Sequence, residues 1–246
     1  MNSLKLPLLI AGCLLSASIH AAQDDVDDVG KWLNERTMQA AREDNAPGPA
    51  SAEREGTYRV IPLAELEAPE EVKQGFRDEI AQSKVKVKRA SVGEIPSVAE
   101  MTASLPKVVL ASEALRSRLR SPPTDLQATL LGTAELIGME PSGALDGVLH
   151  TGLTRFYRLE DIGIVEFNEN HFRAPGSTIT VIAEMQNLRV NGVPGRLDRI
   201  ADSQGRSRAT LNWAGESKLY TLIATGEGDV QRKAEVLQQI AAAVRD

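Results

Sequence analysis

Residues 188–224, LRVNGVPGRLDRIADSQGRSRATLNWAGESKLYTLIA, decide the fold. Asn191 and Gly192 stand between two valines, and Asn-Gly in this setting is the strongest short-range signal of a β-hairpin, because a type I′ turn needs positive φ at both central residues. Polar runs that contain glycine, at 202–205 and 214–217, mark two further reversals. Three turns in succession predict an antiparallel β-meander.

Alternation along the predicted strands assigns their two faces, because successive side chains of a strand point to opposite sides of the sheet. The residues expected on the buried face are Ile179, Val181, Ala183 and Met185 in one strand, and Ala209, Leu211 and Trp213 in another. Their neighbours along the chain are mostly polar, so one face is predicted to be wet. The predicted strands of the meander are 153–160, 162–168, 177–185, 188–190, 195–200, 207–213 and 218–224.

Helices are predicted where apolar residues recur at helical spacing. The closing helix begins at about Asp229, which is expected to cap it, and its apolar stripe can cover the sheet. That stripe consists of Val230, Ala234, Leu237, Ala241 and Val244. Further helices are predicted at 28–43, 69–82, 106–120 and 122–138, the last capped by Thr124 or Asp125, and further strands at 57–63 and 84–89. The predicted class is α+β: an antiparallel β-meander covered on one face by helices, including a C-terminal helix.

The first 21 residues have the pattern of a cleaved signal peptide. Lys5 precedes an apolar run from Leu6 to Ile19, and acidic residues follow from Asp24 onward. Cleavage after Ala21 or Ala22 would release a periplasmic protein. In the alternative, residues 9–13 (LIAGC) resemble the lipobox of bacterial lipoproteins, in which an acylated Cys13 tethers the chain to a membrane.

Composition excludes several function classes. The net charge is −6, and removal of the leader makes it more negative, which argues against nucleic acid as a partner. Cys13 is the one cysteine, so loss of the leader would remove disulfides and thiolate chemistry. Aromatic residues make up 4%, fewer than a carbohydrate cleft or a stacking platform would use.

The sequence divides into four predicted segments. They are a signal peptide at 1–21, a flexible acidic segment at 22–56, a small mixed segment at 57–105 and the sheet domain at 106–246. Within the acidic segment, Trp32 lies on a short amphipathic pattern. Its helix is expected either to lean on the folded domain or to dock a partner protein.

Arginine is the most unevenly distributed residue. Five arginines fall within twenty residues around two predicted hairpins, at positions 189, 196, 199, 206 and 208. Because the guanidinium fork suits carboxylates and phosphates, Arg196, Arg206 and Arg208 are predicted to bind an acidic partner or a lipid headgroup. The alternative explanation is the compositional bias of a GC-rich bacterium.

Catalytic and metal motifs are weak. His171 and Glu169 are two apart, too few ligands for zinc, and His171 is expected in a surface loop. The carboxylates at 160, 161, 166 and 169 are expected on a solvated surface, where general acid chemistry lacks the burial that raises a pKa. We therefore predict no catalytic residue, metal or cofactor.

Residues 179–244 resemble the end of secreted bacterial sheet domains found in envelope proteins linked to anti-sigma factors and to lipoprotein sorting. The shared features are the VNG hairpin, a strand ending in Trp213, the apolar strand after it and a closing helix beyond a Gly-rich loop. The resemblance implies sensing, sorting or binding. We therefore expect a periplasmic, non-enzymatic binding or regulatory protein that acts on an envelope protein or lipid, with a carrier of lipid or hydrophobic ligands, or a glycan or cell-wall hydrolase, as alternatives.

Overall fold

The chain forms two compact units that are discontinuous in sequence. Unit 1 comprises Met1–Lys84 and Phe172–Met185, and unit 2 comprises Val85–His171 and Gln186–Asp246. The computed structural model describes residues 8–9, 29–36, 56–83, 86–105, 112–173 and 178–245. Cys13 and most of the predicted acidic segment lie outside the described residues.

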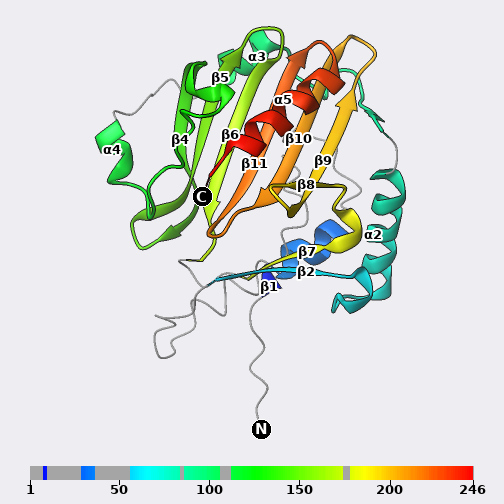
Figure 1. Cartoon of the computed structure of the whole chain (residues 1–246). Helices are drawn as coiled ribbons and strands as arrows, with labels where there is room; N and C mark the ends of the chain where they lie inside the picture. Colours follow the sequence, from blue (N-terminus) through cyan, green and yellow to red (C-terminus); the bar gives the residue numbers. More distant parts are fainter. Residues whose placement is uncertain are drawn as a thin grey trace. The chain divides into compact units, whose positions relative to one another are not determined.

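Unit 1 contains a three-stranded parallel sheet with the order β1-β7-β2. Its elements are β1 (Leu8–Leu9), β2 (Thr57–Ile61), β7 (Thr178–Ile182), α2 (Glu70–Ser83), the 3₁₀ turns η1 (Leu63–Glu65) and η3 (Ala183–Met185), and a helix at 29–36 (Figure 1). Helix α2 confirms the prediction from apolar spacing, and Pro69 precedes its first residue.

The core of unit 1 joins residues far apart in sequence. It consists of Trp32, Ile61, Leu63, Leu66, Val72, Phe76, Ile182 and Met185. Trp32 is 8% exposed. The backbone N–H of Leu63 donates to both carboxylate oxygens of Glu184, at 3.1 and 2.9 Å.

The strand predicted at 177–185 is wrong in its sheet and its length. It ends at Ile182 as β7, pairs in parallel with β2, and continues into the turn η3. Thr180 is buried beside Ile179 and Ile182, so the predicted one-sided burial is also wrong. Alternation within a strand does not identify a partner that lies more than a hundred residues away.

Unit 2 contains an eight-stranded sheet with the order β3-β9-β10-β11-β6-β5-β4, and β8 also pairs with β9. Its pairings are antiparallel except that of β3 with β9. The strands are β3 (Lys88–Arg89), β4 (Glu135–Asp146), β5 (Leu149–Leu159), β6 (Gly163–His171), β8 (Leu188–Val190), β9 (Val193–Ala201), β10 (Arg206–Ala214) and β11 (Lys218–Glu227).

The meander and its closing helix confirm the predicted fold class. Asn191 and Gly192 have φ of 49° and 85°, as the type I′ turn between β8 and β9 requires. Helix α5 (Val230–Ala243) lies across β10 and β11 in Figure 1, and the carboxylate of Asp229 accepts a hydrogen bond from the N–H of Arg232 at 2.7 Å. Asp229 is therefore the predicted cap.

One face of the sheet is filled by α5 and by the strand residues beneath it. The predicted stripe of α5 is buried, as are Ala209, Leu211 and Trp213 of β10. The side chains in this layer that are 0% exposed include Ala209, Leu211, Leu222, Ala224, Ala234, Leu237, Ile240 and Ala241. This layer is a packed core.

Two predicted helices are wrong or shorter than expected. Residues 122–129 are irregular, η2 (Leu130–Gly132) is a single 3₁₀ turn, and the rest of the predicted helix 122–138 begins β4. Thr124 caps no helix, because its polar groups bind within the sheet unit. The helix predicted at 106–120 is described only as α4 (Ser112–Arg116), and residues 106–111 lie outside the described residues.

The first part of unit 2 also differs from its prediction. The strand predicted at 84–89 is described as the two residues of β3, and positions 84 and 85 lie outside the described residues. Helix α3 (Val98–Ser104) was not predicted; it opens with a capping box between Ser97 and Glu100.

Candidate functional site

A charged cluster lies on the α5-covered face of the sheet. Glu169 of β6 follows Phe167 by two residues, and Lys218 of β11 precedes Tyr220 by two, so alternation places both charged residues on the face of the core. Arg155 of β5 stands opposite Phe167 in the register and joins them. Three neighbouring strands therefore bring the three charges together.

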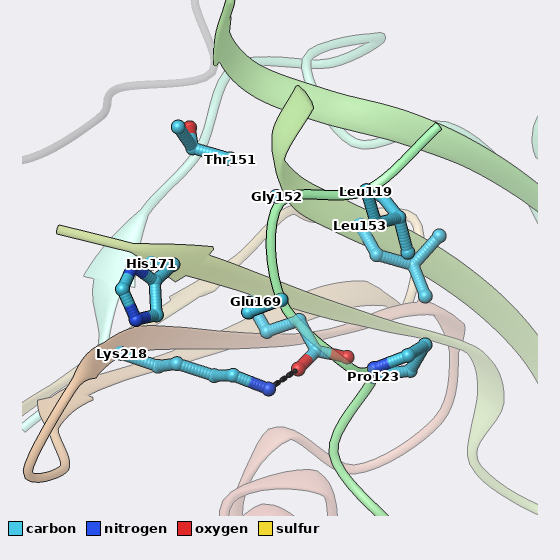
Figure 2. Close-up of a pocket in the computed structure, with 9 residues that line it drawn as sticks. Leu119, Pro123, Thr151, Gly152, Leu153, Glu169, His171 and Lys218 are labelled. Carbon is cyan, nitrogen blue, oxygen red and sulfur yellow. Dashed lines mark hydrogen bonds and ion pairs between the residues drawn. The ribbon is translucent and has the colours of Figure 1, made fainter. Parts of the chain in front are cut away.

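Glu169 accepts hydrogen bonds from three residues. Its Oε2 accepts from Lys218 Nζ at 2.7 Å, from Thr124 N at 2.8 Å and from Thr124 Oγ1 at 2.6 Å, and its Oε1 accepts from Arg155 Nη2 at 2.7 Å. Figure 2 shows Glu169 and Lys218 joined in this way. Glu169 is 3% exposed, so the expectation of a solvated carboxylate at this position is wrong.

The chain segment over the cluster supplies further polar partners. Lys218 Nζ donates to the Pro122 carbonyl at 2.7 Å and to Thr124 Oγ1 at 2.9 Å, and Arg155 Nη2 donates to the Thr124 carbonyl at 3.0 Å. These bonds compensate part of the cost of burying ions. Residues 122–124 are irregular because their backbone groups bind the cluster.

The cluster carries more positive than negative charge. Lys218 and Arg155 face one carboxylate, that of Glu169, within hydrogen-bonding distance. The Nε of Arg155 is buried and has no hydrogen-bond partner. A buried excess of one positive charge favours an anion nearby.

Aromatic rings form the wall between the cluster and the core. The Arg155 guanidinium carbon lies 5.1 Å from the centre of the Phe167 ring, and Tyr220 stacks on Trp213 at 5.0 Å. The Tyr220 hydroxyl lies 3.2 Å from Thr124 Oγ1. Burial raises the pKa of the Tyr157 phenol, and the charge of Arg155 opposes that shift. Tyr157 is therefore uncharged at neutral pH.

A small cavity lies on one side of the cluster. Figure 2 shows its lining, which consists of Leu119, Ser121, Pro123, Thr151, Gly152, Leu153, Glu169, His171 and Lys218. The cavity has about 10 Å³ of space, enough for one water molecule. It is too small for an organic ligand.

A larger groove borders the same segment of chain, with a volume of about 590 Å³. Its polar lining consists of Arg116, Thr124, Asp125, Gln127, Arg155 and Tyr157, and its apolar lining includes Leu126, Leu131, Ala134 and Leu136. Arg155 belongs to both the cluster and the groove. A ligand in this groove would meet the charge excess and an apolar wall together.

The predicted arginines lie on both faces of the sheet. Arg196, Arg206 and Arg208 lie on the face opposite α5, whereas Arg199 donates to Gln231 of α5. Arg196 is 5% exposed and forms a two-bond ion pair with Asp198, at 2.6 and 3.2 Å. Arg206 donates to the Ile95 carbonyl and to Glu100.

Arg208 lies near a second carboxylate, that of Glu166, on the face opposite α5. Burial raises the pKa of Glu166, the charge of Glu140 raises it further, and the charge of Arg208 lowers it. Glu166 and Glu169 lie on opposite faces of β6, since they are an odd number of residues apart. The structure therefore does not bring the predicted carboxylates together.

The remaining predicted residues lie elsewhere. Trp32 is part of the unit 1 core, and its indole lies 5.6 Å from the Arg36 guanidinium carbon. His171 is half-buried at the end of β6, so its prediction as a loop residue is wrong. Within the described ranges, no three or more His, Cys, Asp and Glu residues gather as a metal site.

Comparisons with protein-family models, with curated proteins and with solved structures found no match to this chain. None of the helices in the described part of the chain is long and apolar enough to cross a membrane.

Proposed function

We propose that the chain is a non-enzymatic binding protein of the bacterial envelope, and that the groove beside Arg155 receives an anionic group of its partner. One observation carries the proposal: Arg155 belongs to a buried cluster with two cations and one carboxylate, and it also lines a groove of about 590 Å³. The partner is an envelope protein or lipid that presents a carboxylate or a phosphate.

The groove favours an anionic group that is attached to apolar surface. Leu126, Leu131 and Leu136 line it together with the arginines at 116 and 155. A charge-assisted hydrogen bond to such a guanidinium contributes about 1.5 to 3 kcal/mol, and apolar contact with the leucines adds to it. A fatty acid or the carboxyl end of an apolar peptide has this combination of features.

The hydrogen bonds of Glu169 support binding rather than catalysis. A general acid or base must exchange a proton with a substrate, yet the oxygens of Glu169 accept four hydrogen bonds from groups of the chain itself. The other ionisable side chains of the cluster, Arg155 and Lys218, both donate hydrogen bonds to Glu169 and are therefore no better placed to exchange a proton with a substrate. We propose that the cluster holds the Arg155 side chain in position beside the groove.

The packed layer under α5 gives no support to the carrier alternative at that place. A hydrophobic-ligand carrier would need space between the sheet and the helix, and the side chains there are 0% exposed. We therefore place the ligand in the groove.

Calorimetric titration of the full chain with dodecanoate tests the proposal, with dodecyltrimethylammonium as the probe of opposite charge. We expect dodecanoate alone to bind, and Arg155→Met to weaken its binding at least about tenfold. Arg116→Gln should weaken it less, because Arg116 is exposed. Arg232→Gln, on the exposed side of α5, is the matched control. Equal binding of both probes would contradict the proposal.

The proposed location depends on the leader pattern. An intact mass of the protein from soluble and membrane fractions of its host tests it directly. A soluble species that starts at Ala22 or Gln23 would support the periplasmic form. Acyl mass on Cys13 would support the tethered form, and an intact Met1 in both fractions would contradict the location in the envelope.

A further inference from the structure

The hairpin between β4 and β5 carries exposed apolar side chains at its tip. Val148 is 86% exposed and Leu145 is 65% exposed, the two highest values among the large hydrophobic side chains of the described residues. Exposed apolar side chains that cluster on one projecting element mark an interaction site. We call Leu145 and Val148 the apolar tip.

The geometry of the hairpin holds the apolar tip outward. Leu145 pairs with His150 and Asp146 with Leu149, and the register shifts between Ser142 and Leu145. Gly147 has a φ of 64°, which the turn requires. Beyond this shift, two residue pairs close the hairpin at the tip.

Arginines lie beside the turn of this hairpin. The His150 N–H donates to the Arg118 carbonyl at 2.8 Å, and the Arg120 N–H donates to the His150 carbonyl at 2.9 Å. Leu119 between them is buried in a cluster with Leu115 and Leu153. Because side chains alternate, Arg118 and Arg120 point away from that cluster, and both are exposed.

The pairing at His150 brings cations to the tip. Leu119 and His150 form a parallel bridge, which places Arg118 next to Leu149 at about the 4.8 Å spacing of paired strands. Arg118 and Arg120 therefore place two exposed positive charges beside the turn.

We infer that the apolar tip and the arginines at 118 and 120 contact the surface of an anionic lipid membrane. Small apolar side chains enter the interface between headgroups and acyl chains, while arginines beside them are attracted to the anionic headgroups. A stable protein partner would require about 800 Å² of complementary surface, far more than two projecting side chains provide. The inference goes beyond the proposed function and leaves the groove residues Arg155 and Arg116 aside.

An environment-sensitive dye attached at residue 148 tests directly whether the apolar tip contacts the membrane. Cys13 is the one cysteine of the chain, so Cys13→Ser with Val148→Cys allows a single dye at the tip of the full chain. The matched control is Cys13→Ser with Val92→Cys, because Val92 is also exposed, at 63%, and lies outside the hairpin. Neutral vesicles of phosphatidylcholine alone are compared with anionic vesicles that contain roughly 40% phosphatidylglycerol.

We expect a blue shift of the dye at 148 with anionic vesicles only, and no shift at 92. Adding Arg118→Gln and Arg120→Gln should weaken the apparent affinity by about fivefold for each charge. Arg232→Gln should leave it unchanged. Equal shifts at 148 and 92, or no shift at 148, would overturn the inference. A shift that appears only when a protein extract is added would overturn it in favour of a protein partner.

Discussion

The face of the sheet that α5 covers has two halves that differ in chemistry although the same strands build them. On β6, Phe167 lies in the apolar core, and Glu169 begins the charged cluster. On β11, Leu222 is 0% exposed among apolar side chains, and Lys218 is 7% exposed among polar ones. The difference follows the element that covers each half.

Beyond its first turn, helix α5 presents aliphatic side chains, and apolar residues lie beneath it. At the first turn Lys233 is buried, and its Nζ donates to Ser207 Oγ and to the carbonyls of Gly226 and Glu227. The segment at 119–126 presents backbone carbonyls and the hydroxyl of Thr124, so ions can be buried beneath it. The polarity of the covering element, and not the strand pattern, therefore decides where this sheet tolerates charge. The predictions that follow test it, and each uses Trp32→Phe so that Trp213 is the one tryptophan that reports on unit 2.

Removing the carboxylate alone should have the largest effect. Glu169→Ala leaves Lys218 and Arg155 buried without their anion, which costs about 3 to 5 kcal/mol of unfolding free energy. Urea denaturation followed by Trp213 fluorescence measures this loss. Glu160→Ala, at an exposed turn, is the control, and an equally small loss in both variants would contradict the role of the cluster.

Truncating a buried side chain of α5 should cost slightly less unfolding free energy. Leu237→Ala removes a side chain that is 0% exposed, and we expect a loss of about 3 kcal/mol from lost burial and the cavity left behind. The same urea titration measures it. Gln238→Ala, one residue further along α5, is the neighbouring control. A loss below about 1 kcal/mol would show that the layer is loosely packed.

Replacing all three charges together should cost far less than removing one. Arg155→Met, Glu169→Leu and Lys218→Met in one chain remove the buried ions as a set, and such exchanges are neutral or stabilising by about 1 to 4 kcal/mol. The unsatisfied Thr124 groups reduce that gain here. Stability is expected within about 2 kcal/mol of the parent, while dodecanoate binding is lost.

The cap of α5 should contribute about 1 kcal/mol. Asp229→Ala removes the acceptor of the Arg232 N–H, whereas Asp229→Ser keeps one. We expect the alanine variant alone to lose stability by urea denaturation. Equal stability of both variants would show that the cap has no energetic role.

The smallest expected effect concerns Glu166, on the face opposite α5, and depends on pH. The pKa of Glu166 in the folded chain lies above its ordinary value of 4.5, so the folded state binds the proton more tightly than the unfolded state. Stability therefore falls as pH rises through the interval between the two pKa values. Glu166→Gln should stabilise the chain at pH 7 and leave it unchanged at about pH 3.5. Urea denaturation at both values tests this, with Glu160→Gln as control.

Sequence patterns of a few residues correctly predicted the turns, caps and helix faces that depend on residues close together in the chain. The turn at Asn191-Gly192, the cap at Asp229 and the stripe of α5 are each determined by residues close in sequence. Strand β7 was recognised as a strand but not placed, because its partner β2 lies far away in sequence. The helical spacing in 122–138 was misleading because contacts with the sheet override the local propensity of Thr124 and Leu126.

The candidate site was missed for one specific reason. The predicted strand ended at residue 168, so the alternation that buries Val165 and Phe167 was not extended to Glu169. Extending it by one residue would have placed a carboxylate on the buried face and raised the question of its partners. Arg155 and Lys218 carry no motif, and only the pairing of β5, β6 and β11 brings them together.

The discontinuity of unit 1 has a consequence for the order of folding. Its sheet closes only when β7 reaches β2, and the bond from Leu63 to Glu184 spans 121 positions, whereas the hairpins of unit 2 close over a few residues. Closing a loop of that length instead of a hairpin costs roughly 3.5 kcal/mol of chain entropy, about 0.6 for each doubling. The hairpins from β8 to β11 therefore form early, and unit 1 assembles late from two separated pieces of the chain.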